Sequence, residues 1–454
     1  MTAAAPPKRT LLRDLTLFGT VALVSGNMLG TSLYTLPASV ASVAGPIGIV
    51  SWVITAAGFL LLALLYAELG PRYPRTGGPY VFAREAFGEF AGFQTVWMYW
   101  LSAVVGNAAI VTGAIGYAVA FSPRLAESHL LQFALAQGVV WLLCLINILG
   151  VKQSARVQKS ILLINIIPLV LLSLALFKLD PANFHPFHPK GTWTPVAAGS
   201  ALMVWAYAGI ESATVPAEEM QAPQRTIRLG TLLGYGLATM IFLLSAVAVI
   251  GALPNDVIAS SARPLELAVR KTLGPVPAIL VSMAAIGASI GVLNGWILMA
   301  GRIPFSAAQD GLFFSAFARV HPRFGTPYVA LIGGCVITSA MLTLYFIPGS
   351  TLLGVFNFTV LLANLGTLFP YLYNSAAALM LARRDLDRFT IREQRKTSLL
   401  ALVCFLFLVW TTWGVGAQIV FWGFLILLLG TPLYIWFKTR PARSGLSLAA
   451  SRST

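Results

Sequence analysis

The chain has 454 residues, of which 57% are hydrophobic and only 10% are charged, against about 25% charged residues in an ordinary soluble domain. So few charges cannot cover the surface of a water-soluble fold of this length, which argues against soluble enzymes and nucleic-acid-binding proteins. The net charge of +15 does not indicate an acidic partner, because the basic residues lie in short gaps between long apolar runs.

The apolar runs, taken in chain order, predict an all-α polytopic membrane protein with twelve transmembrane helices, because about 20 apolar residues suffice to cross a bilayer. Residues 1–14 form an N-terminal tail and 438–454 a C-terminal tail. The predicted spans cover 15–43, 46–70, 90–121, 129–149, 157–178, 195–220, 229–253, 277–306, 328–347, 351–382, 397–415 and 417–437. Spans 1–10 (15–382) form the expected core, and 397–437 adds two further helices.

The basic residues predict the orientation of these spans. Most of the 30 Lys and Arg residues lie in the two tails and the even-numbered gaps, and an excess of positive charge is typical of cytoplasmic loops. Both termini are therefore expected to be cytoplasmic, as an even number of spans requires. The opposite gaps hold only Arg124, Lys178, Lys190, Arg263, Arg270 and Lys271.

Two predicted spans contain residues that interrupt a helix. The first carries glycines and polar residues from Ser25 to Ser32, and the sixth carries Gly209 followed by Glu211. Glycine costs about 1 kcal/mol in a helix interior, and polar groups at the bilayer midplane need partners. The glycines alone are also compatible with a kink or with close helix packing.

The two interrupted spans occupy corresponding positions in two five-helix halves, about 15–178 and 195–382. Such paired breaks indicate a transporter site built on inverted repeats. Half-helix ends offer N–H groups for a carboxylate and carbonyl groups for an ammonium. A zwitterionic amino acid is the small molecule that fits both ends.

Four stretches carry a resemblance to a known family. They are Val24–Pro37, the loop Pro74-Arg75-Thr76-Gly77-Gly78-Pro79-Tyr80, Gly209–Pro223, and Asn294-Gly295-Trp296 continuing to Gly325-Thr326-Pro327. With Pro370-Tyr371-Leu372-Tyr373, the likeness covers roughly 14–437. The sequence resembles the amino acid/polyamine/organocation transporter superfamily, within it the basic amino-acid/polyamine antiporter group.

The resemblance implies a LeuT-like fold of five helices and five inverted helices, followed by two more. It also implies substrate-binding and gating residues without cofactor, metal or covalent catalysis, and a homodimer in the bilayer. The implied substrate-binding residues are Asn27, Gly30, Thr31, Ser32, Asn107, Trp205, Gly209, Ile210, Trp296 and Ala363. Tyr99, Glu211 and Tyr371 are the implied gating and proton-coupling residues.

Each implied role has a structural alternative. Tryptophan and tyrosine are common at the membrane interface, but Trp205 and Trp296 fall well inside their spans, which favours stacking on the substrate. Asn107 is equally suited to hydrogen bonding between helices. Glu211 has the strongest functional case, because a lone carboxylate in the membrane is costly when charged and is suited to exchange a proton.

The sequence also departs from the family pattern. Gly30-Thr31-Ser32 replaces the family's Gly-Ser-Gly, so that a side chain is added at the floor of the site. Ala363 stands where arginine exchangers of this group have a serine, and Asn165 stands where several amino-acid permeases have a lysine. These departures bear on the choice of substrate and of coupling ion.

The function expected from these observations is secondary active transport across the plasma membrane (the inner membrane of a bacterium). We expect an antiporter that exchanges a cationic, arginine-like amino acid for its decarboxylated amine or another amino acid by alternating access. A proton-coupled or facilitative amino-acid permease is the alternative, since Glu211 suits both. The expected partners are a small amino acid or amine and the lipid bilayer, with no nucleic acid.

Overall fold

The computed structural model describes residues 16–75, 77–150, 166–187, 190–215, 217, 220 and 222–439. Within these ranges the protein is built from helices and connecting loops, with no β-strand. Nine stretches of the described chain are long and apolar enough to cross a membrane, so the protein is an all-helical polytopic membrane protein.

The helices follow one another with short connections. The N-terminal part contains α1 (Leu17–Ala44), α2 (Gly48–Arg72), α3 (Pro79–Phe87), α4 (Glu89–Ala118), α5 (Pro123–Glu127), α6 (His129–Leu149) and α8 (Ile166–Ala175). After it come α9 (Trp193–Tyr207), α10 (Pro223–Ala252), α11 (Asn255–Ser260), α12 (Pro264–Leu273), α13 (Pro275–Gln309), α14 (Tyr328–Met341), α15 (Leu352–Arg384), α16 (Ile391–Val415) and α17 (Ala417–Thr439). Short 3-10 turns are η1 (Gly45–Ile47), η2 (Val119–Phe121), η3 (Leu176–Lys178), η4 (Pro181–Phe184), η5 (Ile210–Ala213), η7 (Ser315–Ala318) and η8 (Leu342–Phe346).

Two helices begin earlier than the apolar pattern predicts, and local chemistry accounts for both. Helix α16 begins at Ile391 rather than 397, because the side chains of Thr390 and Glu393 cap its first turn reciprocally. Helix α10 begins at Pro223 rather than 229. Proline is favoured in the first turn of a helix, where its missing N–H would have no intrahelical acceptor. The polar first turns extend both helices beyond their apolar portions.

The nine apolar stretches compare with the twelve predicted spans as follows. The first stretch, Leu17–Arg72, contains both α1 and α2. Helix α9 ends after 15 residues, which is too short for a span by itself. Span five was predicted at 157–178, and its first part, including Asn165, lies outside the described residues. The twelve-span count, the repeats 15–178 and 195–382, and the LeuT-like fold remain predictions.

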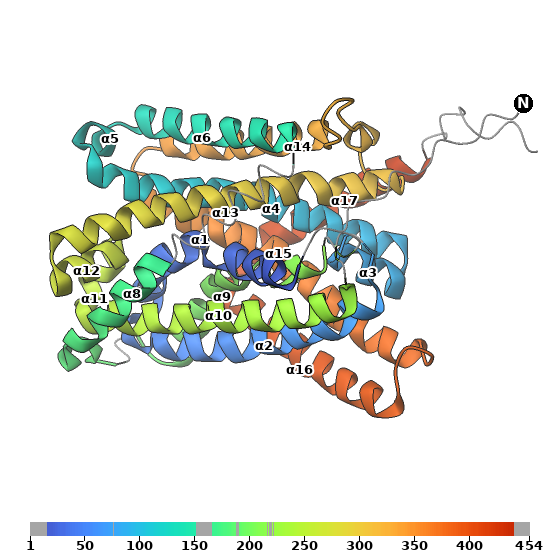
Figure 1. The fold of residues 1–454 in the computed structure, drawn as a ribbon, viewed down its shortest axis with the longest axis horizontal. Helices are drawn as coiled ribbons and strands as arrows, with labels where there is room; N and C mark the ends of the chain where they lie inside the picture. The colour runs from blue at the N-terminus through green and yellow to red at the C-terminus, as the bar shows by residue number, and fades with distance from the viewer. Residues whose placement is uncertain are drawn as a thin grey trace, which may run out of the picture.

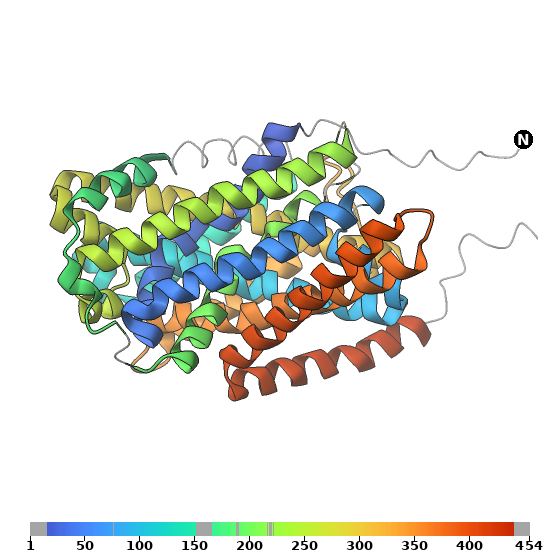
Figure 2. The same cartoon turned by 90° about the horizontal axis from the view of Figure 1, so that it is seen from below.

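The two interrupted helices lie inside the bundle. Helix α1 packs against α10, α9 and α13, and α4 packs against α15 and α13. Figure 1 shows α6 and α14 along one side of the molecule and α2, α10 and α16 along the other, with α1 and α9 between them. In Figure 2, α16 and α17 form an outer edge. Only 17% of the most apolar part of α17 is buried, as expected for a helix that borders lipid.

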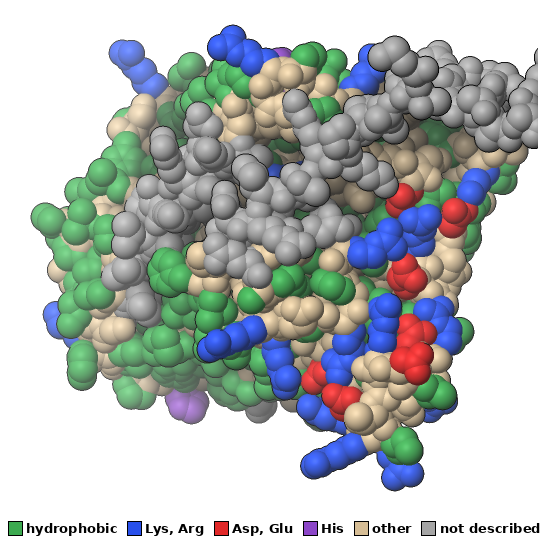
Figure 3. Space-filling model, turned by 45° about the vertical axis from the view of Figure 1, so that its right-hand side comes forward, with side chains coloured by type: hydrophobic (Ala, Val, Ile, Leu, Met, Phe, Trp, Pro, Cys, Tyr) green, Lys and Arg blue, Asp and Glu red, His purple; other side chains and the backbone are tan. Residues whose placement is uncertain are grey.

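Charged side chains gather at one end of the bundle, while the flank in the same view is mostly hydrophobic (Figure 3). At this end α3 is tied to the end of α13: Tyr80 Oη and Arg84 Nη1 each donate to Asp310 Oδ2 at 2.6 Å. Burial, together with the bond to the Asp310 carboxylate, raises the pKa of the Tyr80 hydroxyl. At the charged end, therefore, hydrogen bonds and an ion pair join α3 to the end of α13.

Candidate functional site

The break in α1 lies at Gly30. Its torsion angles, φ −37° and ψ −130°, are non-helical, although helix continues on both sides. A Cβ atom at this position would lie 2.7 Å from Cγ2 of Val292 on α13, closer than real carbon atoms approach. Glycine therefore permits both the change in chain direction and the close contact with α13.

The break between α9 and η5 lies at Ala208 and Gly209. Ala208 is extended (φ −61°, ψ 131°) and Gly209 is left-handed (φ +103°), a conformation that residues with a Cβ adopt at a cost. A Cβ on Gly209 would lie 2.9 Å from Cβ of Asn27. Asn27 Nδ2 in turn donates to Ser212 Oγ at 2.8 Å. The two breaks are thus in direct contact and are joined by a buried hydrogen bond.

A small, narrow cavity lies between the breaks. Residues of α4 and α13 line it together with the broken segments, and the lining combines two indoles with small and polar side chains. The lining residues are Asn27, Met28, Gly30, Thr31, Ser32, Ile110, Trp205, Ala208, Val292 and Trp296. The structure therefore brings Asn27, Gly30, Thr31, Ser32, Trp205 and Trp296, six of the residues singled out in the sequence, around one space.

The two tryptophans of the cavity are held by different contacts. The Trp205 indole lies against the backbone of α4, where a Cβ on Gly106 would come within 2.6 Å of its Cη2 atom. Trp296 packs against Tyr99, with ring centroids 6.2 Å apart and planes tilted by 40°. Both indoles are almost fully buried. Neither indole lies on the outer surface of the bundle.

The cavity wall also carries Thr31 and Ser32, the residues that depart from the pattern implied by the resemblance. Ser32 Oγ donates to the Met28 carbonyl at 2.5 Å, and the Thr31 carbonyl accepts from Thr35 Oγ1 at 2.6 Å. The Thr31 methyl group lies against Gly113 of α4. The side chain of Ser32 is thus bonded back to its own helix, while its backbone remains at the cavity wall.

A buried carboxylate lies beside this cavity. Glu211, in η5, is fully buried; Tyr99 Oη donates to its Oε1 and Tyr371 Oη donates to its Oε2 at 2.7 Å. Among the described residues the carboxylate forms no ion pair, and these two hydroxyls are the side chains that donate to its oxygens, while Thr214 Oγ1 donates to the Glu211 carbonyl at 2.7 Å. Because Tyr99 also packs on Trp296, a continuous set of contacts joins the cavity to the carboxylate.

Four of the ten implied substrate-binding residues do not line the cavity. Gly209 contacts Asn27, which lines the cavity, and Ile210 is buried next to Glu211 in η5. Ala363 lies near Gly106, on which Trp205 rests. Asn107 is buried on α4, and its Oδ1 atom has no hydrogen-bond partner in the described part of the chain. It lies one turn from the cavity-lining Ile110.

Met28, Ile110, Ala208 and Val292 line the cavity but were missed by the sequence analysis. Each had a signal in the pattern. Met28 and Ala208 adjoin the residues of the two breaks, Ile110 is three residues after Asn107, and Val292 is four residues before Trp296. Residues three or four apart lie on the same face of a helix. None of the four has a distinctive side chain, which is why motif matching did not select them.

Metal coordination is not indicated in the part of the chain that the structure describes, where no three His, Cys, Asp or Glu residues are grouped. The chemistry available at the site consists of hydrogen bonding, aromatic stacking and proton exchange at one carboxylate. These are means of binding a small molecule and of coupling its binding to protonation.

Comparison with known proteins gives the same family throughout. The family model described as amino acid permease matches residues 15–438. A Bacillus subtilis protein named "Putative arginine/ornithine antiporter" is 29% identical over 79% of this chain and 82% of its own length. The cadaverine/lysine antiporter of Escherichia coli is 31% identical over 80% of this chain and 82% of its own length. The putrescine transporter of the same organism is 26% identical over 90% of this chain and 92% of its own length.

Proposed function

The chain belongs to the amino acid permease family and is a secondary transporter, and from this premise we propose that it exchanges a cationic amino acid for an amine or a second amino acid. It is a transporter rather than an enzyme. The proposed exchange occurs at the cavity between the two helix breaks, in the bacterial inner membrane with both termini cytoplasmic. The observation that carries the proposal is the cavity itself, with Trp205 and Trp296 in its wall.

The broken helices supply the groups for the amino-acid end of the substrate. Beyond Gly30 a second half-helix begins, and the first N–H groups of a helix lack intrahelical acceptors and attract anions. Thr31 and Ser32 stand at this position in the cavity wall. At the opposite break α9 ends, leaving carbonyl groups near Ala208. We assign the substrate carboxylate to the first end and its ammonium to the second.

The rest of the cavity suits a cationic side chain. A guanidinium or ammonium over an indole gains roughly 0.5–2 kcal/mol, which favours binding without preventing release. Beyond the indoles, the unpaired Oδ1 of Asn107 is a buried acceptor one turn from Ile110. The relatives' printed substrates, which are arginine, ornithine, lysine, cadaverine and putrescine, all carry such a cationic group. This agreement supports a basic amino acid or polyamine over a neutral substrate.

Replacing Trp296 by alanine tests this assignment. We expect the affinity for labelled arginine to fall by about 2- to 30-fold, the equivalent of roughly 0.5–2 kcal/mol, and the affinity for the cognate amine to fall with it. Equilibrium binding to the purified protein measures both. Trp413→Ala is the matched control, because Trp413 is 61% exposed at the end of α16 and does not line this cavity. An unchanged affinity in Trp296→Ala would remove Trp296 from the proposed site.

A further inference from the structure

The corner between α15 and α16, residues 383–396, combines positive charge with exposed apolar side chains. It contains six Arg and Lys residues against three Asp and Glu residues. Leu386 is 65% exposed and Ile391 is 71% exposed. Both flanking helices are apolar enough to cross a membrane, so that the corner lies at the surface of the bilayer. An apolar side chain in that position enters the boundary between headgroups and acyl chains.

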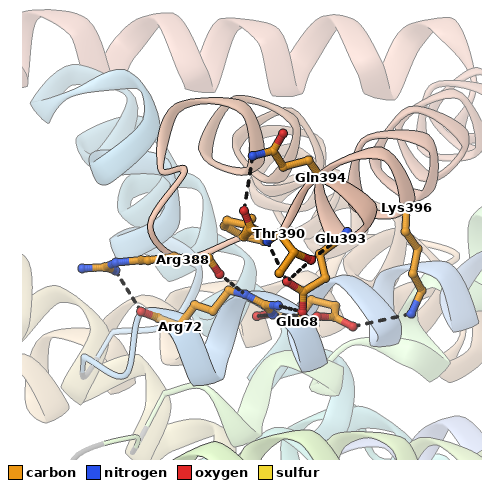
Figure 4. Close-up of polar contacts among 8 residues, drawn as sticks. Glu68, Arg72, Arg388, Thr390, Glu393, Gln394 and Lys396 are labelled. Carbon is orange, nitrogen blue, oxygen red and sulfur yellow. Dashed lines mark hydrogen bonds and ion pairs between the residues drawn. The ribbon is translucent and has the colours of Figure 1, made fainter.

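The corner is held to the end of α2 by the polar network of Figure 4. Arg72 donates to Glu68 Oε2 at 2.6 Å and to Glu393 Oε1 at 2.8 Å. Arg388 donates to the Arg72 carbonyl at 2.8 Å, and its guanidinium lies 4.5 Å from the ring centroid of Tyr73. These contacts fix the position of the corner relative to the bundle.

The acidic groups of the corner are engaged within the same layer. Asp385 accepts from Tyr73 Oη and Arg384, and the Arg384 guanidinium holds the pKa of the Asp385 carboxyl below its ordinary value. Glu393 is bonded to Thr390 and Arg72. Asp387 is the remaining acid, and it is exposed. The corner is therefore a preformed structure in which two of three carboxylates already have basic or hydroxyl partners.

The first turns of α16 separate its charges onto two faces. Glu393 lies on the face that continues through Thr397, Ala401, Cys404 and Leu408, all of which are buried. Arg392 and Arg395 lie on the opposite face, which continues through Leu399, Leu402 and Leu406, exposed by 64%, 49% and 58%. Because that second face is apolar and uncovered along a membrane-spanning helix, it faces lipid. The two arginines therefore stand directly above acyl chains.

Arg392 and Arg395 are also free to bind a ligand. Both are exposed, and neither forms an ion pair with a residue that the structure describes, whereas Arg72, Arg84 and Arg384 all do. Charge complementarity identifies the occupant, since a pair of unengaged guanidinium groups above a lipid-facing surface matches the phosphate of an anionic lipid.

We propose that the α15–α16 corner binds an anionic phospholipid, with Arg392 and Arg395 on the headgroup phosphate and Leu399 against the acyl chains. This site is separate from the cavity between the helix breaks. Its occupant is a lipid of the surrounding leaflet rather than a transported molecule. The proposal does not depend on which substrate the protein carries.

The test uses the full-length protein, purified in a neutral detergent and titrated with phosphatidylglycerol or with phosphatidylcholine of the same acyl chains. Native mass spectrometry measures the fraction of protein that retains each lipid. We expect preferential retention of phosphatidylglycerol, weakened by salt. Each arginine near an anionic lipid contributes about fivefold in affinity, so that Arg392→Gln with Arg395→Gln should weaken binding by roughly 25-fold. Replacement of both by lysine should preserve most of it.

The matched control is Arg124→Gln with Lys271→Gln. These cations are exposed on α5 and α12, away from the corner in sequence, and their loss changes the net charge equally. We expect this control to retain phosphatidylglycerol like the unmodified protein. Equal weakening in both double variants would mean that only overall charge matters and would overturn the proposal. So would an unchanged affinity in the Arg392/Arg395 variant, or no preference of the unmodified protein for phosphatidylglycerol.

Discussion

Replacing Glu211 by glutamine is expected to abolish the pH dependence of transport while leaving the protein folded. Glutamine has the size of glutamate and still hydrogen-bonds Tyr99 and Tyr371, which contact the carboxylate. It cannot take up or release a proton. If Glu211 is the group that couples protonation to gating, the ratio of transport rates at acidic and neutral pH should fall to near one. Uptake by proteoliposomes across a pH series measures this ratio.

Glu266→Gln is the control for this experiment. Glu266 is also a buried carboxylate, 1% exposed, but it is paired with Arg263, which directly precedes α12, and with Arg270 on α12. Glutamine at this position would lose the attraction to both arginines, whose side chains are 31% and 46% exposed. We therefore expect Glu266→Gln to lower thermal stability and to keep the pH profile. A full pH dependence in Glu211→Gln would show that Glu211 has a structural role and that the proton is exchanged elsewhere.

Gly209→Ala is expected to remove most transport activity by disturbing the contact between the two helix breaks. The left-handed conformation costs a residue with a Cβ about 1–2 kcal/mol, and the new methyl group would lie 2.9 Å from Cβ of Asn27. Asn27 would then have to move from Ser212 and from the cavity wall. If this displacement raises the activation free energy of transport by about 1.4 kcal/mol, the transport rate falls tenfold. Measuring the amount of folded protein and the transport rate in the same preparation distinguishes a loss of activity from a loss of stability.

Two further Gly→Ala changes separate the causes of that loss. Gly416 has a positive φ of 95° with open space around it, and Gly138 is helical with open space around it. Gly416→Ala introduces backbone strain without a collision, and Gly138→Ala introduces neither. We expect both to retain transport. Normal transport by Gly209→Ala would mean that the junction of the two breaks does not position the site.

The sequence predicted the helical class and most of the helix positions, because apolar runs in a membrane protein are long and uninterrupted. It also indicated where the helices break, since glycine weakens a helix and polar residues within an apolar span are costly unless they have partners. It did not predict α3, α11 and α12 as separate short helices. They lie between the spans and carry no long apolar run.

The site was predictable to the extent that its residues are chemically distinctive. Tryptophan, asparagine and a lone glutamate inside spans stand out, and the resemblance supplied roles for them. Met28, Ile110, Ala208 and Val292 do not stand out, because ordinary apolar residues become part of a site only through the packing of helices far apart in sequence. For the same reason, the contact between Gly209 and Asn27 could be found only in the folded structure.

The ion pairs between distant helices at the charged end could not be predicted from the sequence either. The spacing of Glu68 and Arg72 fits a local helix pair, and the two do bond. The partner that links α2 to α16, Glu393, is more than 300 residues away in the chain. No local pattern relates Arg72 to Glu393. Arg392 and Arg395 of α16, in contrast, are recognised in the structure by their exposure and by the face of the helix on which they lie.

Counterflow in proteoliposomes tests the central claim of exchange most directly. Vesicles containing the purified protein are loaded with unlabelled arginine, lysine, ornithine, agmatine, cadaverine, putrescine, a neutral amino acid or buffer, and labelled arginine is added outside. The proposed function predicts uptake when the lumen holds a cationic amino acid or amine, and none when it holds buffer. Equal uptake into buffer-loaded vesicles would contradict obligatory exchange and identify a permease. No uptake with any cationic load would contradict the proposed substrate class.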